Sequence, residues 1–366
     1  MHILYYISSH GYGHGVRSCA IGNCFSEQVT LTLRTMLPER FFEEELTRPF
    51  TYTQGTFDCG CIQSDSITVD IRKTLYTYMK IADRNEAVLD AEAAWCRDRN
   101  VSGIVTDIAP FPCEVAKRAG VPCIAVSNFS WHDIYEPYLS DVPEFKPYFD
   151  KITEQYLMTD LLLGLTPTNA MRCFNRRKEM PVVGRVGTDR KREIKSFYGI
   201  ATDKKIGLIY TGDFGMDSVC WKELETLTEW EFIGVYPLPG SPANFHHIDK
   251  ANFPYQDLSA STDVMITKIG YGVYSECLCN GVPLIYVPRE NFAEHPVLEE
   301  AILEWGHGYR IPPDDFYSLT WQPALQKIEN DMPPEKIKSV GAQECAREIE
   351  MFFDDYRNGS SGIPVG

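Results

Sequence analysis

The stretch Lys268-Ile-Gly-Tyr-Gly-Val-Tyr-Ser-Glu276 joins an apolar segment, residues 263–267, to a segment with helical composition. Glycines at such a turn let the backbone approach a ligand, and the first N–H groups of a helix have no partner within the helix. The loop is therefore predicted to bind an anion such as a diphosphate, with the helix starting near Gly272. Glu276 follows one turn later, where a carboxylate can accept hydrogen bonds from ribose hydroxyls.

A second glycine loop, Ser8-Ser-His-Gly-Tyr-Gly-His-Gly-Val-Arg17, lies near the N-terminus. It follows apolar residues 3–7 and precedes a helix predicted from about Val16. A single Gly-x-Gly turn is more often only a site of tight packing than a phosphate site. Two loops in the same context predict two nucleotide-binding halves.

Short apolar runs alternate with helical stretches along both halves of the chain, which predicts α/β domains with mainly parallel sheets. In the first half the predicted strands are residues 3–7, 29–33, 103–106, 124–126 and 161–165, and a long helical pattern covers residues 67–99. In the second half they are residues 205–210, 231–235, 244–246, 263–267 and 283–287, with a turn at 211–217 followed by a helix.

The predicted domain organisation follows from these patterns and from a glycine-containing, charged segment between the halves. We expect a first domain at 1–180, a linker at 181–192, a second domain at 193–342, a helix at 343–357 that returns to the first domain, and a flexible tail at 358–366. The basic residues between 172 and 192 are typical of a solvated linker.

Composition excludes several classes of function. The net charge of −16 argues against a nucleic-acid partner, because phosphate backbones bind basic surfaces. No apolar stretch reaches the roughly 20 residues that span a bilayer, and the N-terminus lacks the features of a signal peptide, so a cytoplasmic location is expected. The 12 cysteines are scattered through apolar segments as reduced thiols would be, and neither they nor His246-His247 have the spacing of a metal site.

Several motifs together resemble the GT-B glycosyltransferase superfamily, and within it the glycosyltransferase-like N-terminal region of L-arabinokinases and their bacterial relatives. These motifs are His10-Gly-Tyr-Gly-His14 with Arg17, Asp107-Ile-Ala-Pro with residues 116–120, Asn128-Phe-Ser-Trp131, and the 268–276 loop. The resemblance implies a GT-B fold with two facing Rossmann-like domains. It places a nucleotide-sugar donor, UDP-type most often, on the second domain, an acceptor on the first, and chemistry in the cleft between them. A kinase half like that of an arabinokinase is not expected within these 366 residues, so a sugar-kinase activity is disfavoured.

The resemblance also implies the donor contacts. They are Thr211, Gly212, Phe214, Gly215, Lys268, Ile269, Gly270, Tyr271, Gly272, Ser275 and Glu276 in the second half, with Gly11, Gly13 and Arg17 in the first. Phe253 would flank the nucleobase or pack at a helix entry. Arg289 and Asn291 would meet the donor sugar. Arg17 is equally consistent with a surface salt bridge.

Inverting sugar transfer requires a base for the acceptor hydroxyl, and His14 is the first candidate, with His10 as the second. A helix-start hydrogen bond is the alternative role for His14. Asp107 follows a predicted strand and would orient the base or grip an acceptor hydroxyl, or else cap a helix. Acceptor contacts are expected from Asn128, Trp131 and Asp133, with a core position as the alternative for Trp131.

The sequence therefore predicts an inverting, metal-independent glycosyltransferase without a cofactor, whose donor sugar and acceptor are open. Hydrolysis or epimerisation of a nucleotide sugar on the same fold is one alternative. A catalytically silent sugar-nucleotide sensor or subunit is another.

Overall fold

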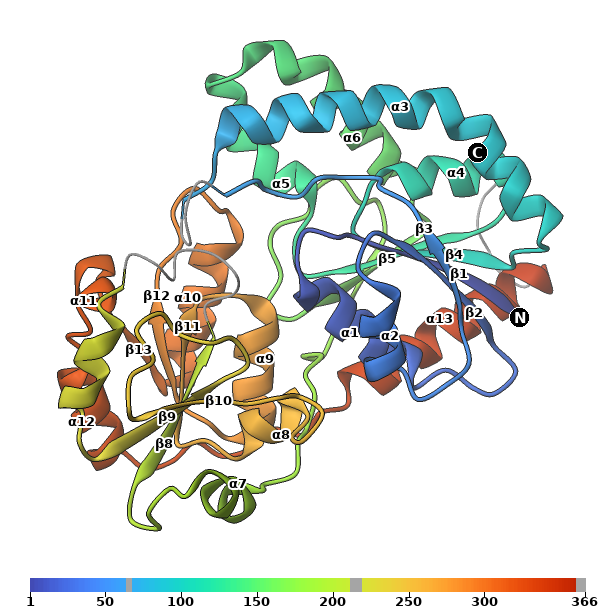
Figure 1. Ribbon diagram of the computed structural model, residues 1–366. Coiled ribbons are helices and arrows are strands. Elements are labelled where there is room, and N and C mark those ends of the chain that lie inside the picture. The colour runs from blue at the N-terminus through green and yellow to red at the C-terminus, as the bar shows by residue number, and fades with distance from the viewer. Residues whose placement is uncertain (64–67, 211–218, 360–366) are drawn as a thin grey trace. The chain divides into compact units, whose positions relative to one another are not determined.

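The computed structural model describes residues 1–63, 68–210 and 219–359, and the chain divides into two units. Unit 1 comprises Met1–Ile62, Asp70–Val183 and Val340–Gly366, and unit 2 comprises Gln63–Val69 and Gly184–Ser339. Each unit contains a parallel sheet with helices packed on it (Figure 1). The two Rossmann-like domains predicted from the glycine loops are thereby confirmed.

The sheet of unit 1 has seven strands among the described residues, in the order β3-β2-β1-β4-β5-β6-β7. Its inner strands are continuous buried apolar runs, as expected where helices cover both faces of a parallel sheet. The strands are β1 (His2–Ile7), β2 (Thr30–Thr35), β3 (Thr51–Gln54), β4 (Gly103–Asp107), β5 (Cys123–Ser127), β6 (Leu161–Leu165) and β7 (Arg177–Met180).

Helices pack on both faces of this sheet. On one face α3 packs against α4 and α4 against α6, and on the other α1 packs against α2 and the C-terminal α13 (Figure 1). The long proline-free pattern after residue 67 forms one helix, α3, whose start is capped by the Asp70 carboxylate accepting from the Lys73 N–H. The helices are α1 (Tyr12–Gly22), α2 (Glu39–Glu45), α3 (Ile71–Asp98), α4 (Phe111–Ala119), α5 (Trp131–Tyr135), α6 (Lys146–Leu157) and α13 (Gly341–Arg357), with 3-10 turns at Glu136–Ser140 and Pro143–Phe145.

The sheet of unit 2 has six strands within the described part of the chain, in the order β10-β9-β8-β11-β12-β13, and all pair in parallel. Trp230, Phe232 and Trp321 are buried in its core. The strands are β8 (Lys205–Tyr210), β9 (Trp230–Gly234), β10 (Phe245–His247), β11 (Val264–Lys268), β12 (Leu284–Val287) and β13 (Gly308–Arg310), and the helices are α7 (Lys191–Tyr198), α8 (Tyr255–Ala260), α9 (Tyr271–Asn280), α10 (Glu294–Trp305), α11 (Pro313–Tyr317) and α12 (Gln322–Asn330).

Some sequence expectations need correction. The helix expected after the 211–217 turn is the 3-10 segment Trp221–Thr226, and β3, β7 and β13 were not predicted. Residues 184–190, expected to be a solvated linker, instead bond to α8 and α9 within unit 2. No described helix has the length and apolar character needed to cross a membrane.

Each sheet reverses its strand order at one point. In unit 1 the chain leaves β1 toward β2 and β3 and then returns to β4 on the other side, and in unit 2 the same reversal separates β8 from β11. In open parallel sheets, ligands bind beyond the carboxyl ends of the strands at this switch point. The candidate site residues of each unit therefore lie where the topology favours a ligand.

Candidate active site

The switch point of unit 1 brings the first glycine loop beside Asp107. Ile7 ends β1 in register with Asp107, which ends β4. The Ser8 N–H, which opens the glycine loop, donates to the Asp107 backbone carbonyl at 2.6 Å. Segments far apart in the sequence thus converge at the carboxyl edge of one sheet.

The glycine loop leads into the N-terminus of α1. Gly11 is the N-cap with extended backbone, φ −174°, and no side chain caps the helix. No described atom lies within 4 Å of a Cβ built on Gly11 or Gly13. The start of α1 therefore has room beside its glycines and no side-chain cap on its first N–H groups, as an anion or hydroxyl ligand would require.

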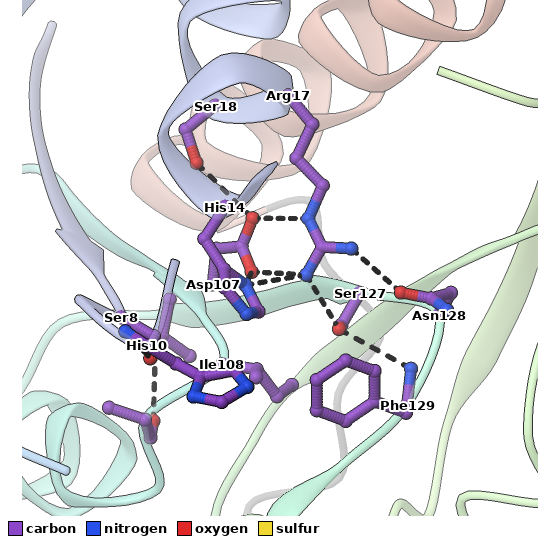
Figure 2. A network of polar contacts seen from close by, with 12 residues as sticks. Ser8, His10, His14, Arg17, Ser18, Asp107, Ile108, Ser127, Asn128 and Phe129 are labelled. Carbon is purple, nitrogen blue, oxygen red and sulfur yellow. Dashed lines mark hydrogen bonds and ion pairs between the residues drawn. The ribbon is translucent and has the colours of Figure 1, made fainter. Parts of the chain in front are cut away.

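His14 and Arg17 on the first two turns of α1 both contact the Asp107 carboxylate (Figure 2). The His14 Nδ1 lies 2.8 Å from Asp107 Oδ1. The Arg17 Nε donates to Oδ2 at 2.6 Å, and Nη2 donates to Oδ1 at 2.5 Å. Asp107 is fully buried, and His14 and Arg17 are 6% and 5% exposed.

Neighbouring polar groups complete the network around Arg17 (Figure 2). Its Nη1 donates to Asn128 Oδ1 at 2.7 Å and its Nη2 to Ser127 Oγ at 3.0 Å. Ser18 Oγ donates to Asp107 Oδ2 at 3.2 Å. Arg17 is therefore a buried cation that lies beneath the loop. Its salt bridge is in the interior and not on the surface, where the sequence analysis had also placed it.

The charge on Asp107 bears on which ring nitrogen of His14 carries a proton. Burial raises the pKa of the Asp107 carboxyl, but the charges and hydrogen bonds of Arg17 and His14 outweigh it and hold that pKa below its usual range. An ionised carboxylate only accepts hydrogen bonds, so the contact with Asp107 is a hydrogen bond when His14 Nδ1 carries the proton; the same Nδ1 lies 2.9 Å from Arg17 Nη2. With the proton on Nδ1, the lone pair of the imidazole is on Nε2, where a general base needs it.

His10 lies beside His14, with ring centroids 6.1 Å apart. Its Nδ1 accepts from the Cys61 N–H at 3.1 Å, and its ring meets the edge of Trp131 at 5.4 Å. His14 packs against Phe129 at 5.8 Å. The contact of His14 with the Asp107 carboxylate favours His14 over His10 as the base.

Asp58 is a buried carboxyl that the sequence analysis missed. It accepts from Ser8 Oγ at 2.9 Å and from Trp131 Nε1 at 2.8 Å, and Ser8 Oγ in turn accepts from the His10 N–H at 3.3 Å. Burial raises its pKa, against the opposing effect of the bonds from Trp131 and Ser8. The sequence offered no signal for Asp58, since it follows no predicted strand.

The expected acceptor residues are largely structural. Trp131 is fully buried and stacks on Tyr135 at 5.5 Å, so the core alternative applies. Asp133 forms a capping box with Ser130 at the start of α5. Asn128 is fully buried against Arg17. Asp107 does not cap α4, whose N-cap is Pro110.

The glycine loop of unit 2 repeats the geometry of the first. Gly270 is the N-cap of α9 with extended backbone, φ −169°, no side-chain cap and no described atom within 4 Å of a built Cβ. Lys268 ends β11, and its Nζ donates to Gln63 Oε1 at 3.2 Å. The side chains of Ile269 and Tyr271 are buried. The Ile269 N–H donates to the Val287 carbonyl at 3.3 Å, so of these two residues only Tyr271 could meet a diphosphate through its backbone N–H. Gly272 lies in the first turn of α9.

Two further residues of α9 have inward-facing side chains. Ser275 Oγ donates to the Gly272 carbonyl at 2.9 Å and is 1% exposed. The Glu276 carboxylate, predicted to hold a ribose, pairs with Arg185 Nε at 2.6 Å and accepts from Ser259 Oγ at 3.1 Å. Arg185 was not identified from the sequence, because it lies in the segment expected to be solvated.

Comparison with known proteins gives two curated relatives. The chain is 28% identical over 337 residues to L-arabinokinase of Arabidopsis thaliana, covering 90% of this chain and 32% of that protein. It is 29% identical over 101 residues to an uncharacterised glycosyltransferase of Methanopyrus kandleri, covering 27% of this chain and 29% of that protein. The chain thus spans about a third of the length of the curated relatives it matches. No protein-family model matches it.

Solved structures resemble nearly the whole chain. The calicheamicin glycosyltransferase CalG4 has a TM-score of 0.63 at 15% identity, covering 96% of this chain and 98% of its own. The chain has the GT-B fold of glycosyltransferases. Arabidopsis thaliana UGT89C1 complexed with UDP shares this GT-B fold with a TM-score of 0.57 at 14% identity, covering 95% of this chain and 94% of its own.

The structure describes only some of the remaining candidates for donor binding in the GT-B chain. Thr211, Gly212, Phe214 and Gly215 lie outside the described residues. Phe253 is 3% exposed beneath the Arg190 guanidinium, 4.6 Å from its ring, which favours the packing role over contact with a base.

Arg289 and Asn291 follow β12, as expected for the loop that would meet a donor sugar in the GT-B fold. The Arg289 guanidinium stacks 4.0 Å from the Phe292 ring. Within the described ranges, no three His, Cys, Asp or Glu side chains are grouped as a metal ion would need. Metal independence stays a prediction.

Proposed function

We propose that the GT-B chain transfers a sugar from a nucleotide-diphosphate donor, of the UDP type, to an acceptor hydroxyl, with inversion and without a metal ion. The observation that carries this proposal is the 2.8 Å contact between His14 Nδ1 and Asp107 Oδ1 at the open start of α1. The binding of UDP by UGT89C1, a neighbour in fold, supports the choice of donor.

His14 would act as the general base. Its Nε2 takes the proton of the acceptor hydroxyl while the hydroxyl oxygen forms a bond to the anomeric carbon of the sugar. The positive charge that develops on the imidazole is stabilised by Asp107, whose carboxylate Arg17 holds ionised. A single displacement of this kind inverts the configuration at the anomeric carbon.

The other bond of the reaction breaks between the anomeric carbon and the diphosphate oxygen, which leaves with the electron pair. Unit 2 offers the N-terminus of α9, uncapped by any side chain, together with the Lys268 ammonium at the end of β11. Backbone N–H groups and a cation aimed at the leaving diphosphate stabilise its developing charge. These groups need no metal ion to do so.

The test is incubation with UDP-sugars in the presence and absence of simple alcohol and monosaccharide acceptors, followed by UDP assay and NMR of the product. We expect UDP release that depends on acceptor, an inverted glycoside, and no loss of rate with a chelator. Acceptor-independent release would indicate a hydrolase instead. Tight UDP binding without turnover of any UDP-sugar would indicate a sensor.

A further inference from the structure

Residues 184–190 are fixed along α8 and α9 by hydrogen bonds at Arg185 and at the residues after it. The Gly187 N–H donates to Asn280 Oδ1 at 2.9 Å, and Asn280 Nδ2 donates to the Arg185 carbonyl at 2.9 Å. The Thr188 N–H donates to Asp257 Oδ1 at 2.9 Å. The backbone that carries Arg185 is therefore held in one position relative to α9.

Two glycines make this close approach possible. A Cβ at Gly184 would lie 2.6 Å from the Ser275 carbonyl oxygen, and one at Gly187 would lie 1.9 Å from the Gln256 carbonyl oxygen. Any larger residue at either position would push the segment away from the helices. The segment is thus built to lie against α8 and α9.

This fixed backbone places the Arg185 guanidinium on Glu276. Arg185 Nε donates to Glu276 Oε1 at 2.6 Å, and Nη2 lies 2.5 Å from the same oxygen. The two side chains are 13% and 4% exposed. Ser259 Oγ donates to the other oxygen, Oε2, at 3.1 Å.

The number of acceptor positions on Glu276 then limits what it can bind. A carboxylate has about four lone-pair positions, two on each oxygen. In the described part of the chain, two nitrogens of Arg185 lie at Oε1 and one hydroxyl donates to Oε2. One position on Oε2 is left for a ligand.

We infer that Arg185 is a positioning residue for the nucleotide ribose, which fixes Glu276 so that it accepts a hydrogen bond from one ribose hydroxyl instead of two. The inference rests on the proposed function, in which unit 2 holds a nucleoside diphosphate. It gives the site a specific selectivity: one of the two ribose hydroxyls is recognised by the carboxylate, and the other is not.

A purely structural ion pair would not produce this selectivity, so ribose analogues separate the two roles. The probes are UDP, 2′-deoxy-UDP and 3′-deoxy-UDP, with dissociation constants measured by titration calorimetry on the wild-type chain. We expect one deoxy analogue to bind about tenfold or more weakly than UDP, as loss of a bond to a charged group implies, and the other to stay within about threefold.

The same titrations on Arg185→Met test whether Arg185 causes the selectivity. Without the guanidinium, Oε1 has no donor from Arg185 and the carboxylate is free to turn. The dissociation constants of the two deoxy analogues should then differ by less than about threefold. Arg185→Lys keeps the charge without the fork and is expected to bind UDP while also losing selectivity. Arg185→Lys serves as the test variant if Arg185→Met does not fold.

Arg310→Met is the matched control, since Arg310 is a 59% exposed arginine of unit 2 paired with Glu299. It should retain the wild-type selectivity. A wild type that needs both hydroxyls equally, or neither, would overturn the inference while leaving nucleotide binding intact, as would unchanged selectivity in both Arg185 variants. A wild type that binds no nucleoside diphosphate would overturn the proposed function and this inference with it.

Discussion

Arg17 contacts both oxygens of the Asp107 carboxylate, with Nε 2.6 Å from Oδ2 and Nη2 2.5 Å from Oδ1. Both side chains are buried, so neither charge has water to replace its partner. The pair joins α1 to the end of β4 and keeps the carboxylate ionised beside His14. The stability of unit 1 and the chemistry proposed for it would therefore depend on the same contact.

Removing the cation should destabilise the fold. In Arg17→Met the buried Asp107 loses its main counter-charge, and breaking one side of a buried pair costs about 3–5 kcal/mol of unfolding free energy. Denaturant unfolding measures this loss. Arg40→Met is the control, because Arg40 is 86% exposed in its pair with Glu44 and should cost less than about 1 kcal/mol. Equal losses of unfolding free energy in the two variants would contradict this role of the Arg17–Asp107 pair.

Replacing the carboxylate should affect both turnover and acid stability. In Asp107→Asn the base loses the group that sets its tautomer, and we expect kcat for sugar transfer to fall about 10²-fold or more. Because the folded pKa of Asp107 lies below its unfolded value near 3.9, the stability it contributes is complete above that value and is lost as the pH falls through the folded pKa.

The free energies of unfolding of wild type and Asp107→Asn should therefore converge in acid. The exposed Asp141 provides the control, since Asp141→Asn should follow the wild type at every pH. A difference between wild type and Asp107→Asn that stays constant into strong acid would show that the carboxylate is not held ionised.

Asp58 should give the opposite pH dependence. Its pKa is raised by burial, so the folded state binds a proton more tightly than the unfolded state does. Wild-type stability relative to Asp58→Asn should then fall as the pH rises from about 4 through the raised folded pKa. Urea unfolding across this pH range checks the sign. A relative stability that rises with pH would mean that Asp58 is stabilised as the anion.

Trp131 should behave as a core residue. Trp131→Phe keeps an aromatic ring against Tyr135 but removes the Nε1 donor to Asp58, and an unsatisfied buried acceptor costs about 1–3 kcal/mol. With an acceptor identified, its KM should be unchanged in this variant. A KM that rises severalfold without loss of stability would instead return Trp131 to the role of a sugar platform.

The fold could be predicted from the sequence because both glycine loops follow apolar strands. Continuous apolar runs such as Ile124 to Val126 indicate inner strands. The helix predicted to start near Gly272 begins at Tyr271, but the helix predicted from about Val16 begins four residues earlier, at Tyr12. The edge strand Arg177–Met180 was missed because three of its four residues are exposed and charged, so no apolar pattern marks it.

The proposed catalytic pair, His14 and Asp107, could also be predicted, because residues at the carboxyl ends of parallel strands meet at one edge of the sheet. The groups that tune this pair could not be predicted from the sequence. Nothing near Arg17 in the sequence identifies Asp107 as its partner, and Arg185 lies in a stretch whose charges are typical of a solvated segment. Only the packing of distant residues, such as Asn280 against the Arg185 backbone, decides that it is held in place.

The central claim is that His14, oriented by Asp107, is the base of sugar transfer. The most direct measurement is single-turnover transfer from a UDP-sugar by wild type and His14→Gln, with UDP affinity measured in parallel. The account predicts a rate about 10²–10⁴-fold lower, with UDP affinity unchanged and the exposed-residue control His247→Gln at the wild-type rate. Transfer at the wild-type rate in His14→Gln would contradict it.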